Sequence, residues 1–204
     1  MRRVVRVIGL LASVSLFSAG CAAFHKDTAQ YNQPTTITNA IPAQGVLQNG
    51  YALLFDLLGD EKDVSMLRFI KREQPELKTL MIDISRVSGE AYKRLEDFGK
   101  ADSKLNLKNE GLPLAELAAR KSISTMKTRL LLHNKDAQFE LQLLLSQNEA
   151  LVYGANLAQV TAASETDSQR AIYLRETADR LLQLDNRVLQ MLLNRYENPR
   201  VGVK

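Results

Sequence analysis

Residues 75–99 read PELKTLMIDISRVSGEAYKRLEDFG, and this stretch decides the fold. Its apolar residues recur every three or four positions, which places their side chains on one face of an α-helix. Pro75 suits the first position of a helix, because its missing N–H would have no partner there. Gly99 suits the left-handed residue that often follows a helix. The stretch therefore predicts an amphipathic helix over 75–98. The apolar face comprises Leu77, Leu80, Ile84, Val87, Ala91, Leu95 and Phe98.

The same spacing predicts a helix on the N-terminal side of this stretch, with an interruption at Gly59-Asp60. Residues 64–70 then form either a second helical piece or the continuation of the helix after a kink. The stripe of its first piece consists of Leu47, Tyr51, Leu54 and Leu58.

On the C-terminal side, residues 100–112 are polar and predict a loop. A helical spacing of apolar residues can then be followed through 113–162, and Leu141 is one of the residues on this stripe. One helix of that length would measure about 75 Å at 1.5 Å per residue. The helix at 75–98 could cover only half of it, so we expect a break at 133–136 with Asp136 capping a new helix. A turn at 164–167 and a last helix over 167–197 complete the pattern.

Short links between long amphipathic helices favour antiparallel neighbours. Runs of β-branched residues are short, so strands are not expected. We therefore expect an all-α, up-down antiparallel bundle of four to five helices over 46–198, followed by a tail at 199–204. The helix at 137–162 has a second apolar face, so it is either central in the bundle or docks a partner. That second face consists of Phe139, Leu143, Ala150, Tyr153, Leu157 and Val160.

The N-terminus begins with Met1-Arg2-Arg3 and continues with an apolar core over 7–17. This core is shorter than the ~20 apolar residues that a membrane span needs, and the arrangement is typical of a secretory signal. The following residues, Ser18-Ala19-Gly20-Cys21, resemble the lipobox of bacterial lipoproteins, although Ser18 stands where Leu is usual. The resemblance implies that residues 1–20 are removed and that Cys21, the chain's only cysteine, carries the lipid.

In Gram-negative lipoproteins a residue other than Asp after the lipidated cysteine resembles the signal for delivery to the outer membrane, and here it is Ala22. The resemblance thus implies a cell-envelope protein, anchored in the outer membrane through Cys21 and facing the periplasm. Residues 21–45 would form the lipid anchor and a flexible tether, because they are polar, contain Pro34 and Pro42 and lack apolar periodicity. The tether would have a reach of roughly 25–30 Å.

The charge balance argues against nucleic acid as a partner. The whole chain has 27 Lys and Arg against 23 Asp and Glu. Three of these arginines lie in the segment expected to be cleaved, which leaves 24 basic against 23 acidic residues, a net charge of +1. No basic run stands out, so the electrostatic footprint of a nucleic-acid-binding protein is missing.

Motifs for catalysis or metal binding are weak. A ferritin-like di-iron site needs Glu-x-x-His pairs, whereas His25 and His133 are the only histidines and neither has Glu three residues before it. Ser124 and Lys127 match the Ser-x-x-Lys pattern, but the companion motifs of such enzymes are missing. We therefore expect no catalytic residue, no cofactor and no metal site.

Three polar residues, His133, Asn148 and Asp185, fall on or near the apolar stripes. They could form a buried cluster that binds a small ligand or a metal. The alternative, which we favour, is that His133 marks a helix break and that the other two residues fix the register between helices.

Two functions remain after this survey. The first is a non-enzymatic interaction or scaffold module, anchored through the lipid on Cys21, that binds an envelope protein or a second copy of itself. Its partner surface would include Leu143, Tyr153 and Leu157. The second is a periplasmic carrier of a small ligand or metal, with its site between helices near His133 and Asn148. An enzyme is the third and least favoured reading.

Overall fold

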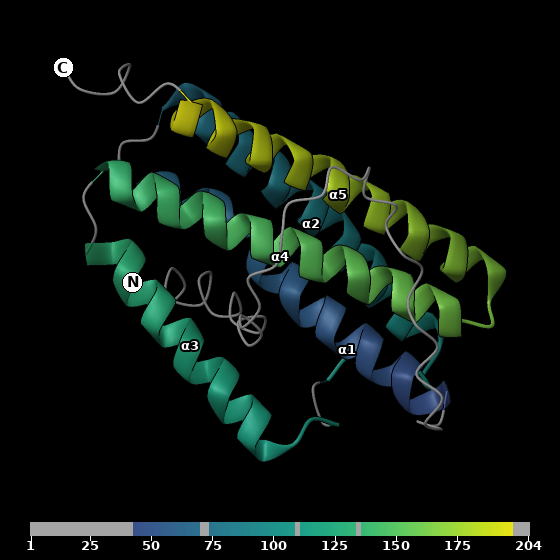
Figure 1. Cartoon of the computed structure of the whole chain (residues 1–204). Coiled ribbons are helices and arrows are strands. Elements are labelled where there is room, and N and C mark those ends of the chain that lie inside the picture. Colours follow the sequence, from purple (N-terminus) through teal and green to yellow (C-terminus); the bar gives the residue numbers. More distant parts are fainter. Residues whose placement is uncertain (1–42, 70–73, 109–110, 134–135, 198–204) are drawn as a thin grey trace, which may run out of the picture.

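The computed structural model describes residues 43–69, 74–108, 111–133 and 136–197 (Figure 1). These residues form only helices and links, with no strand among them. The helices are α1 (Ala43–Glu61), the 3-10 helix η2 (Val64–Phe69), α2 (Pro75–Ala101), α3 (Leu114–His133), α4 (Asp136–Ser164) and α5 (Ser168–Glu197). Five α-helices pack antiparallel, which confirms the expected all-α bundle.

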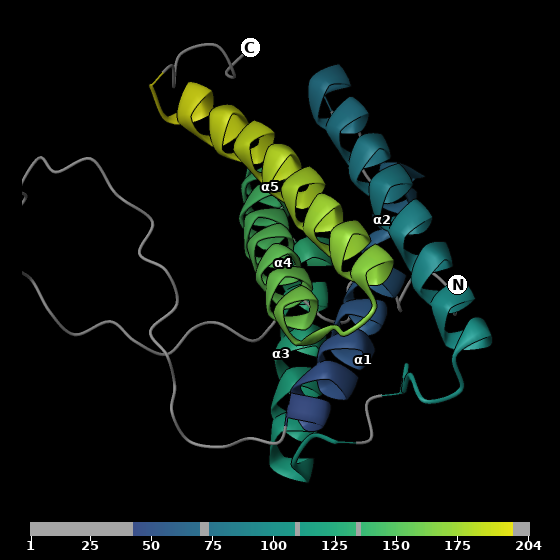
Figure 2. The ribbon, with the colours of Figure 1, turned by 90° about the vertical axis from the view of Figure 1, so that its right-hand side faces the viewer.

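Helix α4 is the centre of the bundle. It packs against α5 along its length, against α1 on another side and against α3 on a third, as Figures 1 and 2 show. Its second apolar face is used inside the molecule, because Phe139, Leu143 and Ala150 are all at most 3% exposed. The sequence left open whether this helix is central in the bundle or docks a partner through its second apolar face. In the structure it is central.

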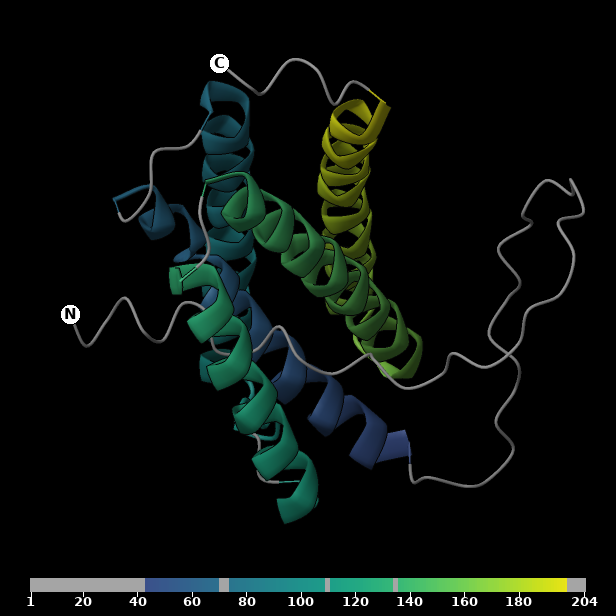
Figure 3. The ribbon, with the colours of Figure 1, turned by 60° about the vertical axis from the view of Figure 1, so that its left-hand side comes forward.

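Helix α3 is attached more loosely than the others. It contacts α4 (Figure 3), and its only buried residues are Ser124 and Leu131. Two polar contacts hold it in place: Arg120 Nη2 donates to Tyr153 Oη at 3.2 Å, and Lys127 forms an ion pair with Glu149. Contacts of this kind contribute less than the burial of an apolar face, so α3 belongs to the edge of the bundle.

The interruption expected at Gly59-Asp60 is wrong in position, because α1 continues to Glu61. The expected second helical piece is present as η2, which begins at Val64. Helix α1 also starts at Ala43, within the predicted tether. The rings of Phe55 and Tyr92 stack with their centroids 4.2 Å apart, and Tyr92 packs directly on Gly59, where a Cβ would lie 3.1 Å from the ring. Tertiary packing on α2 thus holds the helix together where local propensity predicted a break.

The end of α2 also differs from expectation. Gly99 does not cap the helix, which continues to Ala101, and the capping residue Asp102 has an extended backbone with φ −132°. A Cβ on Gly99 would lie 2.6 Å from Leu107 Cδ1. The glycine therefore allows the following loop to pack closely on the helix, and its left-handed conformations are not used.

The two remaining breaks were predicted correctly. Residues 113–162 form two helices, α3 and α4, although residues 134–135 and the side chain of Asp136 lie outside the described residues. At the other break Asp167 caps α5: its Oδ1 accepts hydrogen bonds from the backbone N–H groups of Gln169 and Arg170, both at 2.9 Å.

Candidate functional site

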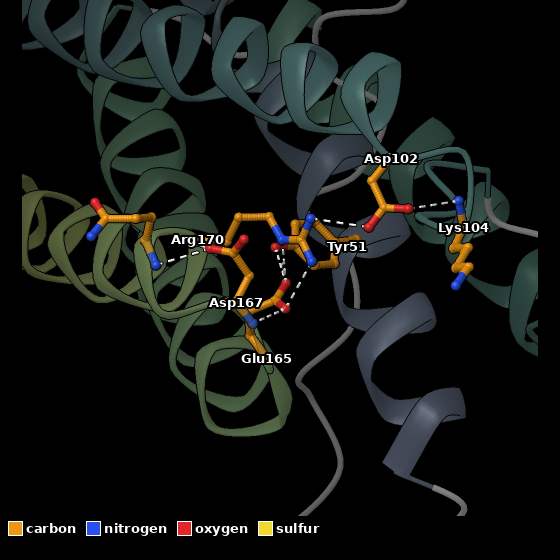
Figure 4. Close-up of polar contacts among 7 residues, drawn as sticks. Tyr51, Asp102, Lys104, Glu165, Asp167 and Arg170 are labelled. Carbon is orange, nitrogen blue, oxygen red and sulfur yellow. Dashed lines mark hydrogen bonds and ion pairs between the residues drawn. The ribbon is translucent and has the colours of Figure 1, made fainter.

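A polar network gathers at the turn between α4 and α5 (Figure 4). The side chain of Glu165 is fully shielded from solvent and lies at its centre. Its Oε2 accepts hydrogen bonds from Tyr51 Oη at 2.6 Å and from Arg170 Nε at 2.9 Å. Its Oε1 accepts from the backbone N–H of Asp167 at 2.9 Å and from Arg170 Nη2 at 3.1 Å. Arg170 Nη1 in turn reaches Asp102 Oδ2 at 3.0 Å.

The electrostatics of this network favour the ion pair. Burial raises the pKa of Glu165, but hydrogen bonds from Arg170 and Tyr51 outweigh it, so the pKa lies below the usual range. Burial, together with the hydrogen bond to Glu165, raises the pKa of the Tyr51 hydroxyl. Each group thus keeps its ordinary charge at neutral pH, and both Glu165 oxygens are occupied by protein donors. The network, called the Glu165 clasp below, ties α1, the end of α2 and α5 together and has no free group for catalysis.

The three predicted polar core residues do not form one site. Asn148 Nδ2 donates to Asp185 Oδ1 at 2.6 Å, across α4 and α5. Burial raises the pKa of Asp185, and the hydrogen bond from Asn148 partly offsets the increase. His133 is exposed at the end of α3, where its Nδ1 lies 2.8 Å from the carbonyl oxygen of Arg129. His133 is thus satisfied within its own helix, and the Asn148–Asp185 pair links two helices in register.

The predicted partner surface is only partly at the surface. Leu143 is 0% exposed and therefore cannot take part in docking, which corrects that part of the prediction. Tyr153 and Leu157 are half-buried, and Tyr153 packs on Leu57 and Ala150. The reason is the central position of α4, which directs this face into the molecule.

Four leucines of α4 and α5 are among the apolar side chains that remain exposed, and Val160 of the predicted second face is also 50% exposed. Leu141 and Leu145 are 46% and 43% exposed, and Leu189 and Leu193 of α5 are 38% and 50% exposed. We call these four residues the leucine patch. The sequence pattern assigned Leu141 to the core stripe, so this surface was missed. The sequence signal that could have indicated the leucine patch is the i, i+4 spacing of Leu141 with Leu145 and of Leu189 with Leu193.

Two cross-links place the leucine patch at one level of the bundle. The Asn148–Asp185 hydrogen bond lies on one side of the patch and the Glu140–Arg195 ion pair on the other. Both leucine pairs fall between these cross-links in sequence. The two pairs therefore lie at matching levels of the antiparallel helices α4 and α5, and all four side chains are exposed.

Within the described residues, no group of three or more His, Cys, Asp or Glu side chains is placed to hold a metal ion. The helices of this part of the chain are also too short or too polar to cross a membrane. Cys21 lies outside the described residues. No protein-family model, curated protein or solved structure matches this chain.

Proposed function

We propose that this chain is a lipid-anchored protein of a bacterial cell envelope, attached to the outer membrane through Cys21 and facing the periplasm. Its helical bundle acts as a non-enzymatic interaction or scaffold module. The observation that carries the proposal is the leucine patch, because four leucines that remain 38–50% exposed at one level of a well-packed bundle offer an apolar contact surface. The anchor rests on the lipobox resemblance of Ser18-Ala19-Gly20-Cys21.

The leucine patch would supply part of the affinity for a partner, because association itself has a cost of several kcal/mol. Full burial of a leucine contributes about 2 kcal/mol, so burial of the exposed half contributes about 1 kcal/mol. Four such residues together contribute about 4 kcal/mol, which corresponds to about a thousandfold in affinity. The partner is an envelope protein or a second copy of the chain.

The proposal is tested by photo-cross-linking in living cells of the source bacterium. A photoreactive amino acid at Leu145 or at Leu189 should give a discrete cross-linked product, which mass spectrometry then identifies. The matched control is Ile82 of α2, which is also apolar and 38% exposed but lies away from the patch. Absence of any product from both patch positions in correctly localised protein would contradict the proposal, as would the same products from all three positions.

A double variant, Leu145→Glu with Leu189→Glu, separates loss of docking from loss of folding. Both side chains are exposed, so its unfolding free energy should stay within about 1 kcal/mol of the wild type. The cross-links formed from Leu193 should disappear in this variant. If they persist unchanged, the patch is not the contact surface.

A further inference from the structure

The C-terminal end of α1 contains a buried carboxyl group without a counter-ion. Glu61, the last residue of the helix, is 3% exposed, and its Oε2 is buried without a hydrogen-bond partner. Opposite it on α4 lies Gln147, which is 0% exposed and whose amide oxygen and nitrogen also have no partner. The amide is close enough to affect the titration of Glu61, yet the two side chains form no hydrogen bond of ordinary geometry. Polar atoms left in this state each cost about 1–3 kcal/mol.

The charges around Glu61 oppose its ionisation. Burial raises the pKa of Glu61 to about 8, and Asp60 adds to this effect, whereas Gln147 opposes it. The pKa of Asp60 is itself raised to about 7, by burial and by Asp56 and Asp63. These acids lie at or just beyond the end of a helix where the backbone dipole is also negative.

Among the described residues, no Lys or Arg contributes to the titration of Glu61. Lys62, the next residue in the chain, has its Nζ 3.7 Å from the centre of the Tyr92 ring. Of the acids on α2, Glu96 is paired with Lys100, and α4 contributes the uncharged Gln147. An ionised Glu61 would therefore be a buried charge with no counter-charge, which a protein avoids by protonating the group or by moving it into water.

The chain around Glu61 has a weak point at which such a movement can occur. Gly59 lies two residues before Glu61, and a glycine inside a helix costs about 1 kcal/mol relative to alanine. After Glu61, the chain is tied to α2: Ser85 Oγ donates to the carbonyl oxygen of Lys62 in the following turn, and Ser65 Oγ of the short helix η2 donates to Ser85 Oγ at 3.1 Å.

We propose that Glu61 is a proton-operated latch: while protonated it holds the last turn of α1 on α4, and when it ionises it leaves the interface and that turn is released. The direction of the pH dependence follows from the linkage between proton binding and docking. The docked state binds a proton that the released state, with an ordinary carboxyl, gives up. Docking is therefore strongest at low pH and weakens as the pH rises between the two pKa values, 4.5 and about 8. In this interval each pH unit raises the fraction of released molecules about tenfold.

Hydrogen–deuterium exchange of the full-length chain tests the latch. Peptides that cover residues 56–66 are followed between pH 5 and 8, and their rates are corrected for the intrinsic pH dependence of amide exchange. Glu61 should contribute about tenfold per pH unit to the rise of the corrected opening equilibrium in the wild type. This contribution should disappear in Glu61→Gln, which leaves only the part due to Asp60, whose pKa is also raised. Glu176→Gln, which changes an exposed glutamate of α5, should behave as the wild type.

A pH-independent opening equilibrium in the wild type would overturn the proposal, and so would a pH dependence as steep in Glu61→Gln as in the wild type. If Glu61→Gln does not fold, carboxyl ¹³C NMR of the wild type decides the matter. A titration midpoint for Glu61 far above 4.5 and near 8 supports the latch, and a midpoint near 4.5 refutes it.

Discussion

Tyr51→Phe removes one hydrogen bond from the Glu165 clasp and leaves the aromatic ring in the core. Tyr51 is 0% exposed, and its hydroxyl donates to Glu165 Oε2 at 2.6 Å. A hydrogen bond to a charged, shielded group contributes about 1.5–3 kcal/mol. Glu165 keeps its bonds from Arg170 and Asp167 in the variant, so no charge is left unpaired. We therefore expect the unfolding free energy to fall by about 2 kcal/mol.

The assay is urea unfolding followed by the helical circular dichroism signal. The midpoint should fall while the slope of the transition stays unchanged, because the same surface is exposed on unfolding. At about 2–4 °C per kcal/mol for a domain of this size, the thermal midpoint should fall by about 6 °C. Tyr92→Phe is the control, since the ring that stacks on Phe55 is preserved, and it should change the unfolding free energy by less than about 0.5 kcal/mol.

A double-mutant cycle attributes the loss to the hydrogen bond. In a Glu165→Gln background the acceptor is neutral, so Tyr51→Phe should cost about half as much as in the wild type. The reasoning fails if Tyr51→Phe costs less than about 0.5 kcal/mol in the wild type. It fails equally if the cost is the same in both backgrounds.

Four further predictions concern single residues. Gly50→Ala should lower the unfolding free energy by about 1–3 kcal/mol, because its Cβ would lie 2.2 Å from Thr161 Oγ1 and push α1 away from α4. Gly45→Ala, in the same helix with nothing within 4 Å of the new Cβ, should raise it by up to about 1 kcal/mol; equal effects in urea unfolding would contradict both predictions. The pKa of Glu165 is lowered in the fold, so its contribution to the unfolding free energy is present above pH 4.5 and is lost as the pH falls through the folded-state pKa. Glu165→Gln should therefore reduce the loss of unfolding free energy at acid pH. An acid loss as steep as that of the wild type would refute this assignment. Fatty-acid labelling in cells should mark the protein and disappear in Cys21→Ala, whereas labelling that persists in the variant would exclude the lipid anchor.

The sequence predicted only part of the candidate site. The sequence pattern indicated that Asn148 and Asp185 fix helix register, and their hydrogen bond agrees with this. The sequence pattern also placed His133 in the same group, although the structure shows it exposed. A residue at a helix end can fall on an apolar stripe and still be exposed to solvent. The Glu165 clasp was invisible beforehand, because Tyr51 and Glu165 are 114 residues apart in the chain. The packing of α1 on α4 and the turn that follows α4 bring them together.

The amino-acid sequence by itself determined the helices, their antiparallel order and the breaks at 133–136 and 164–167, because these depend on local spacing, caps and link lengths. Tertiary structure alone decided that α1 continues through Gly59, since the Phe55–Tyr92 stack stabilises a turn that local propensity disfavours. It also decided that Leu143 is buried and Leu141 exposed. A helix with apolar residues around most of its circumference does not specify which face meets the core, and the positions of α1, α3 and α5 around α4 make that choice.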